Sequence, residues 1–153
     1  MINLPFINSE IQTEFTEKGY VIIPFFNESE VALLQLNYDA VAHNQGLIFE
    51  STSFLEDINV KNNCNEVVST IFKSKIDSIF ENYKPLGTSY LTKRSDQFSS
   101  MPIHQDWTVV DETQFASLTC WVPLIDTTIQ NGAFQVIEGS HLFSDALRGP
   151  SLP

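Results

Sequence analysis

Residues 102–110 read PIHQDWTVV, and we expect a β-strand over the part from Ile103 to Val110. In a strand, side chains at positions i and i+2 point to the same face, so His104 and Asp106 project together while Gln105 and Trp107 face the other way. An imidazole and a carboxylate on one face can share a single metal ion. The stretch therefore predicts two ligands of a metal site.

The residue types of this pair point to iron. Iron(II) in oxygenases is held by two imidazoles and one carboxylate on one face of its octahedron, which leaves open positions for a co-substrate and dioxygen. His104 and Asp106 would supply two of these three ligands. A lone His-x-Asp is a weak signal, because the tripeptide is common by chance and usually forms an ordinary hydrogen-bonded pair.

The surroundings of the pair are rich in short β-like runs. After Pro85 and Gly87, which end a helical pattern, we expect further strands over residues 88–93, 117–124 and 133–138. The sequence therefore predicts an all-β part over residues 85–153.

The first 84 residues have helical periodicity instead. We expect a helix over residues 9–18 that ends at Gly19, and a strand from Tyr20 to Pro24. Asn27 and Glu30 resemble a capping box that opens a helix running to Gly46, and a third helix is expected over residues 65–83. Because nothing marks a linker, residues 1–153 are expected to form one α+β domain, with the helices packed on one sheet.

Composition excludes several classes of function. The 153-residue chain has 19 acidic and 8 basic residues, a net charge of −11 at pH 7, which disfavours nucleic-acid partners. There is no secretory signal pattern and no run near the about 20 apolar residues of a membrane span, so a cytoplasmic protein without membrane contact is expected. Cys64 and Cys120 are expected to be reduced structural thiols.

Four sequence blocks carry a resemblance to a known family. HQDW (104–107), CWVPL (120–124) and NGAFQVIEGSH (131–141) follow one another in the order and spacing seen in phytanoyl-CoA dioxygenases. EFTEKGYVIIPFFNESEV (14–31) resembles the entry segment of the same family. The resemblance thus covers nearly the whole chain.

This resemblance implies a fold, a chemistry and a set of site residues. The fold is a double-stranded β-helix, a cupin-like jelly-roll, and the activity is hydroxylation of a small organic or acyl substrate with Fe(II), dioxygen and 2-oxoglutarate, which becomes succinate. His104 and Asp106 match the family's metal ligands, and Trp121 matches a tryptophan near the 2-oxoglutarate site. Trp121 is equally compatible with an ordinary core aromatic. His141 follows Gly-Ser in a family turn and is not expected to be a ligand.

Lys93 is a further cofactor-binding candidate. It lies on the expected strand before the ligands and could offer a cation to an acidic substrate or co-substrate, although most such lysines are solvated. His43, at a predicted helix end, is expected to be solvated.

Two expected parts of the family site have no candidate. The second metal histidine and the arginine that binds 2-oxoglutarate come several strands after His-x-Asp, but no histidine follows His141 and Arg148 is the only arginine after Arg94. We therefore expect the chain to be the N-terminal portion of a longer jelly-roll, with about half of its β-helix, and to be inactive alone.

Two other functions stay open. One is a non-catalytic jelly-roll that binds a small molecule or a partner, and the other is a cupin-like isomerase or hydrolase that uses zinc or manganese. The substrate and the oligomeric state do not follow from the sequence.

Overall fold

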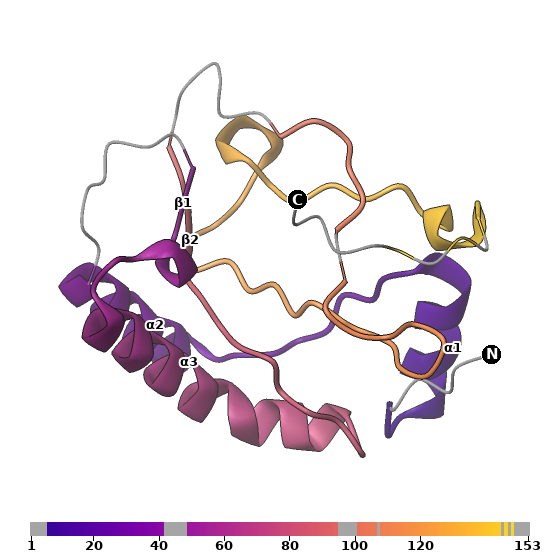
Figure 1. Cartoon of the computed structure of the whole chain (residues 1–153), viewed down its shortest axis with the longest axis horizontal. Helices are drawn as coiled ribbons and strands as arrows, with labels where there is room; N and C mark the ends of the chain where they lie inside the picture. The colour runs from indigo at the N-terminus through magenta and orange to yellow at the C-terminus, as the bar shows by residue number, and fades with distance from the viewer. Residues whose placement is uncertain are drawn as a thin grey trace.

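In the computed structural model of the chain, residues 6–41, 49–94, 101–106, 108–144, 146 and 148 are described. Three α-helices and one two-stranded sheet make up their main regular structure (Figure 1). In chain order these are α1 (Ser9–Lys18), α2 (Glu28–Val41), β1 (Phe49–Ser51), α3 (Ile58–Ile79) and β2 (Leu91–Lys93), with short 3-10 turns η1 (Thr52–Phe54), η2 (Ile129–Asn131) and η3 (Ser140–Leu142). No helix in these ranges is long and apolar enough to cross a membrane.

Local capping sets both ends of α1, where the sequence predicted them. The Asn8 side chain accepts hydrogen bonds from the backbone N–H groups of Glu10 (2.8 Å) and Ile11 (3.1 Å) at the first turn. Gly19 ends the helix in the left-handed conformation, at φ +82°, and its N–H donates to the Phe15 carbonyl oxygen.

The second helix begins with the predicted capping box. The Glu30 N–H donates to Asn27 Oδ1 (3.0 Å), and the Asn27 N–H donates to Glu30 Oε2 (2.9 Å). The structure describes this helix to Val41, so the predicted stop at Gly46 and the prediction for His43 lie outside the described residues.

The third helix begins earlier than predicted, at Ile58 instead of residue 65. The Asp57 side chain caps it by accepting from the N–H groups of Asn59 (2.9 Å) and Val60 (3.3 Å). The polar residues of its first two turns lack the apolar spacing on which the prediction depended, so the cap was the informative signal.

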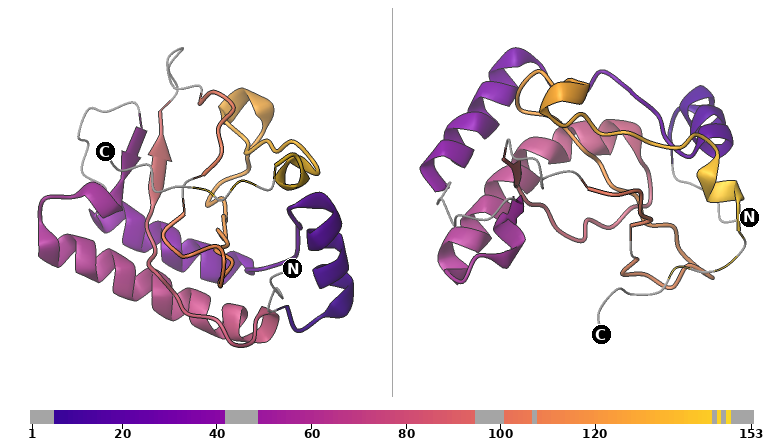
Figure 2. Two further views of the ribbon diagram at one scale, coloured as in Figure 1. Left: turned by 45° about the vertical axis from the view of Figure 1, so that its right-hand side comes forward. Right: turned by 90° about the horizontal axis from the view of Figure 1, so that it is seen from above.

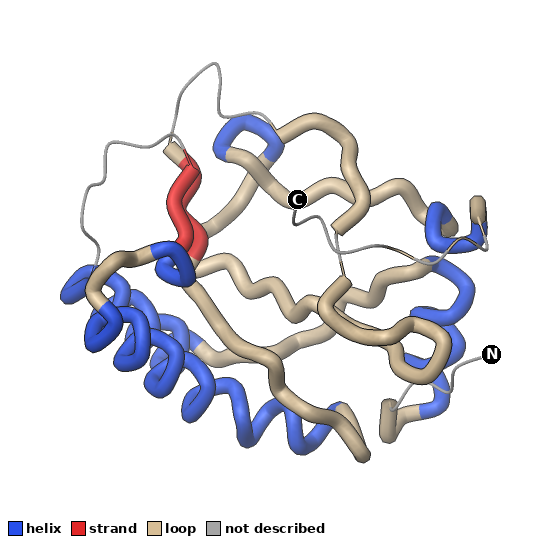
Figure 3. The backbone as a smooth tube through the Cα atoms, viewed as in Figure 1, coloured by secondary structure: helices blue, strands red, loops and turns tan. Residues whose placement is uncertain are grey.

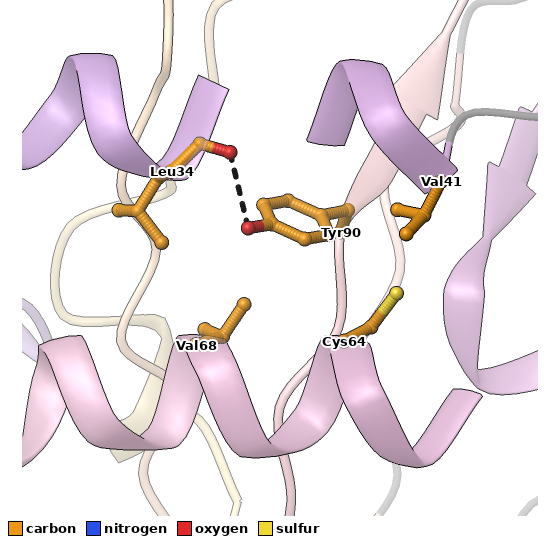
Figure 4. Packing of buried hydrophobic residues seen from close by; sticks show 5 residues of the cluster. All are labelled: Leu34, Val41, Cys64, Val68 and Tyr90. Atoms are coloured by element: carbon orange, nitrogen blue, oxygen red, sulfur yellow. Dashed lines mark hydrogen bonds between the residues drawn. The ribbon is translucent and has the colours of Figure 1, made fainter. Parts of the chain in front are cut away.

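The core lies between α2 and α3, which pack antiparallel, and includes Tyr90, the residue just before β2 (Figure 4). Its buried residues are Leu34, Val41, Cys64, Val68 and Tyr90. The Tyr90 hydroxyl donates to the Leu34 carbonyl oxygen at 3.1 Å and lies 2.9 Å from Asn37 Oδ1. The prediction of a structural thiol is confirmed for Cys64, which is buried and free, whereas Cys120 is free and exposed.

Tyr90 gives the core an alkaline limit that can be measured. Burial, assisted by Cys64, raises the pKa of Tyr90 to about 12, against about 10 in an unfolded chain. The neutral phenol therefore contributes its full stability below the pKa of the unfolded chain. This contribution, about 2 kcal/mol, is lost as pH rises towards the pKa of the folded chain. Urea unfolding of the wild type from about pH 9 to about pH 11.5 should show this loss, and Tyr90→Phe should show a smaller one. Equal pH slopes in the two proteins would contradict the burial of this hydroxyl.

The sheet is much smaller than predicted. β1 and β2 pair antiparallel, with Glu50 opposite Thr92, so only the end of the expected strand 88–93 forms a strand. Sequence reasoning missed β1, which has three residues and no periodicity to detect.

The other predicted strands are wrong for the described residues. Residues 20–24, 117–124 and 133–138, and residues 103–110 apart from the undescribed Trp107, belong to no strand and run as connections and turns (Figure 3). Apolar patterning favours an extended chain, but a strand also needs a hydrogen-bonded neighbour, and in a β-helix that neighbour is distant in sequence. Val136 and Ile137 are successive and each about half exposed, so neither face of that segment is buried as a β-helix strand would be.

The described helices therefore pack on each other and on a small sheet, and the expected jelly-roll layer is not formed among the described residues. Figure 2 shows the segment after residue 101 crossing between the sheet and α1. Its far end is fixed to α1: the Gly139 N–H donates to the Lys18 carbonyl oxygen (2.8 Å), and His141 Nε2 lies 2.9 Å from the Thr16 carbonyl oxygen. Gly19 permits this approach, because a Cβ there would lie 2.4 Å from His141 Nδ1.

Candidate metal centre

The structure brings His104 and Asp106 together. The His104 Nε2 atom lies 3.3 Å from Asp106 Oδ1, and the two side chains are 46% and 55% exposed, so an ion from solvent can reach both. The segment is not a strand, yet the two side chains meet as the i, i+2 spacing predicted. Their role as metal ligands stays a prediction.

The hydrogen bond on the far side of the imidazole suits a metal ligand. His104 Nδ1 lies 2.8 Å from the Pro102 carbonyl oxygen. A carbonyl oxygen only accepts, so Nδ1 must carry a proton, and in the neutral ring Nε2 then has its lone pair directed at the carboxylate. A backbone carbonyl that fixes the tautomer in this way is the usual outer partner of a metal-bound histidine.

The separation of the two atoms also fits one ion. Ligand atoms at about 2.1 Å from a transition metal lie about 3.0 Å apart when they occupy adjacent octahedral positions. The observed 3.3 Å is close to this distance, so the nitrogen and oxygen could both bind one cation with small adjustments. Within the described part of the chain no group of three or more His, Cys, Asp or Glu residues gathers around a point, so the structure shows two candidate ligands and no third.

An ion pair that the sequence did not reveal lies beside Asp106. Arg148 donates to the Asp106 carbonyl oxygen (3.2 Å) and pairs with Glu112, and its hydrogen bonds hold the pKa of Glu112 below the usual range. Residue 148 is 36 positions from Glu112, and no local pattern joins the two.

Trp121 lies in a small aromatic stack apart from the ligand pair. Its ring stacks on Phe134, with centroids 5.6 Å apart and an interplanar angle of 28°. No hydrogen bond or ring contact among the described residues joins it to His104 or Asp106. Trp121 is 42% exposed, so it is not the enclosed core aromatic that was the alternative reading.

Lys93, at the end of β2, extends over a tight turn. Its Nζ lies 3.2 Å from the position that a Cβ on Gly132 would occupy, and Gly132 has φ +95°. The lysine therefore lies beside the turn that leads to Phe134 and the aromatic stack. No contact between Lys93 and the ligand pair occurs in the described ranges.

Comparison with known proteins identifies the family. Residues 15–152 match the family model described as Phytanoyl-CoA dioxygenase (PhyH). The chain belongs to the phytanoyl-CoA dioxygenase family. No curated protein and no solved structure matched it.

Membership of the phytanoyl-CoA dioxygenase family confirms the resemblance drawn from the four sequence blocks. The match includes the HQDW, CWVPL and NGAFQVIEGSH blocks and most of the entry segment. The phytanoyl-CoA dioxygenase family is one of Fe(II)- and 2-oxoglutarate-dependent oxygenases with a double-stranded β-helix. Membership therefore indicates a chemistry and its co-substrates in general terms, but no substrate.

Proposed function

We propose that this protein is an Fe(II)- and 2-oxoglutarate-dependent dioxygenase that hydroxylates a small organic or acyl substrate. The observation that carries the proposal is the meeting of His104 Nε2 and Asp106 Oδ1 at 3.3 Å in a chain of this family. The third ligand lies outside the described residues, and activity requires it. With dioxygen and 2-oxoglutarate, bound Fe(II) supplies the oxidising power for C–H hydroxylation.

The residues of the chain have separate roles in this proposal. The negative charge of Asp106 helps to retain a dication, and His104 offers a neutral nitrogen whose opposite side is fixed by Pro102. Lys93 supplies a cation for a carboxylate of 2-oxoglutarate, and the stacked rings of Trp121 and Phe134 supply an apolar surface for the same co-substrate.

The alternative is a non-catalytic protein that binds a small molecule or a partner. The observation in its favour is that His104 and Asp106 would also form an ion pair if the imidazole were protonated. In that state Nδ1 donates to Pro102 and Nε2 donates to Asp106, and no metal is needed.

Anaerobic titration of the complete gene product with Fe(II) and then 2-oxoglutarate separates these functions. We expect Fe(II) to bind, and the visible charge-transfer absorption of an iron-chelated 2-oxo acid to appear only when both are present. His104→Ala should abolish the absorption. Tight binding of zinc or manganese without any effect of 2-oxoglutarate would favour an isomerase or hydrolase. Failure to bind any metal would overturn the proposal in favour of the binding protein.

A further inference from the structure

The ligand-bearing segment is held in place by side chains instead of a strand ladder. Within the described part of the chain, residues 101–106 belong to no strand. Thr108, two residues after Asp106, is 4% exposed and is the one buried side chain among the described residues of 101–144. Its hydroxyl lies 3.2 Å from Ser117 Oγ and accepts from the Val110 N–H at 3.3 Å. The segment is thus anchored immediately after the ligands.

Arg148 joins this anchor to the ligand itself. Its Nε donates to Glu112 Oε1 (2.7 Å), its backbone N–H donates to Glu112 Oε2 (2.9 Å), and its Nη2 also pairs with Oε1. Nη2 further donates to Ser117 Oγ, and Nη1 donates to the Asp106 carbonyl oxygen, each at 3.2 Å. One guanidinium therefore holds Asp106 directly and Thr108 through Ser117, on both sides of residue 107.

We infer that the Arg148–Glu112 pair is a positioning device for the metal ligands, an inference that rests on the proposed function. Glu112 and Arg148 have side chains only 15% and 24% exposed, so the pair is better shielded from water than a typical surface ion pair. Two guanidinium nitrogens of Arg148 donate to Glu112 Oε1 and its backbone N–H donates to Oε2, so the guanidinium is fixed, and the fixed guanidinium sets the backbone at Asp106. The carboxylate of Asp106 is thereby kept facing His104 Nε2.

The same contacts argue against Arg148 as a receptor for an acidic co-substrate. Four hydrogen bonds, one from Nε, two from Nη2 and one from Nη1, use four of the five N–H donors of the guanidinium. Glu112 neutralises its charge. Binding an incoming carboxylate would therefore require breaking this network.

The test compares metal affinity with stability in matched variants of the intact protein. Mn(II), which accepts the same nitrogen and oxygen ligands as Fe(II) without oxidising in air, is titrated while the spectrum of the free ion is followed by electron paramagnetic resonance. Arg148→Ala should weaken Mn(II) binding about tenfold, as loss of an outer partner usually does. Arg148→Lys keeps the positive charge beside Glu112 but lacks the planar guanidinium that reaches Glu112, Ser117 and Asp106 together. It should therefore fold and still bind Mn(II) more weakly than the wild type.

Arg94→Ala is the control. It removes another arginine that pairs with a partly buried carboxylate, Glu50, at 3.1 Å, and should leave Mn(II) affinity unchanged whatever its effect on urea unfolding. The inference is overturned if Arg148→Ala and Arg148→Lys bind Mn(II) like the wild type. It is also overturned if Arg94→Ala loses Mn(II) affinity in the same proportion to its loss of stability as the Arg148 variants do. Should Arg148→Ala not fold, Arg148→Lys decides. If the wild type binds Mn(II) no better than His104→Ala does, the metal site is absent and the proposed function itself is overturned, before the role of Arg148 is tested.

Discussion

Alanine at His104 or at Asp106 is expected to abolish the formation of succinate from 2-oxoglutarate in the intact protein. Each change removes one ligand atom of a pair whose atoms lie 3.3 Å apart. The loss should exceed about 100-fold, because even partners outside the ligand set change metal affinity or activity by about 10–100-fold. Succinate measured by mass spectrometry and iron content per chain after reconstitution give independent readouts.

Two further variants make this experiment specific. Asp106→Asn keeps the shape of the side chain but removes its charge, so it should retain less iron than the wild type. His141→Ala removes a histidine that lies against α1 through the Thr16 carbonyl and should leave the iron content unchanged. Undiminished turnover in His104→Ala or Asp106→Ala would overturn the ligand assignment. Equal loss in His141→Ala would show that the effect is not specific to the pair.

The helices were predictable where their signals are local. Gly19 directly after α1, and Asn27 before α2 with Glu30 in the first turn of α2, are signals at the helix ends themselves, and the structure confirms both. The strands were not predictable in the same way, because a strand forms only against a partner. Glu50 pairs with Thr92 across 42 positions, and the apolar run after Ser117 finds no such partner among the described residues.

The candidate site shows the same division between local and distant signals. The approach of His104 to Asp106 was visible in the spacing of two residues, and it survives although the segment is not a strand. The contact of Arg148 with Asp106 joins positions 42 residues apart, and no sequence motif indicates it. Likewise, Lys93 and the NGAFQVIEGSH block were noted separately, and only the structure places the lysine beside Gly132 of that block.

Leu34→Ala is expected to be the most destabilising single change in the described core. Leu34 is 1% exposed, lies beside Val68 and Tyr90, and carries the carbonyl group that accepts from the Tyr90 hydroxyl (Figure 4). Truncating a buried leucine costs about 2–5 kcal/mol, since it loses transfer free energy and leaves a cavity. A typical domain has about 5–15 kcal/mol in total, so a large share of the stability would be lost. Urea unfolding measures the change.

Leu36→Ala on the same helix is the matched control, because Leu36 is 68% exposed. It should change stability by no more than about 0.5 kcal/mol, as exposed substitutions usually do. Equal effects at the two positions would mean that α2, α3 and Tyr90 do not form the core. A large effect at Leu34 alone would assign the stability of the described chain to the helix pair. The ligand segment, whose one buried side chain is Thr108, would then depend for its order on the polar network around Arg148.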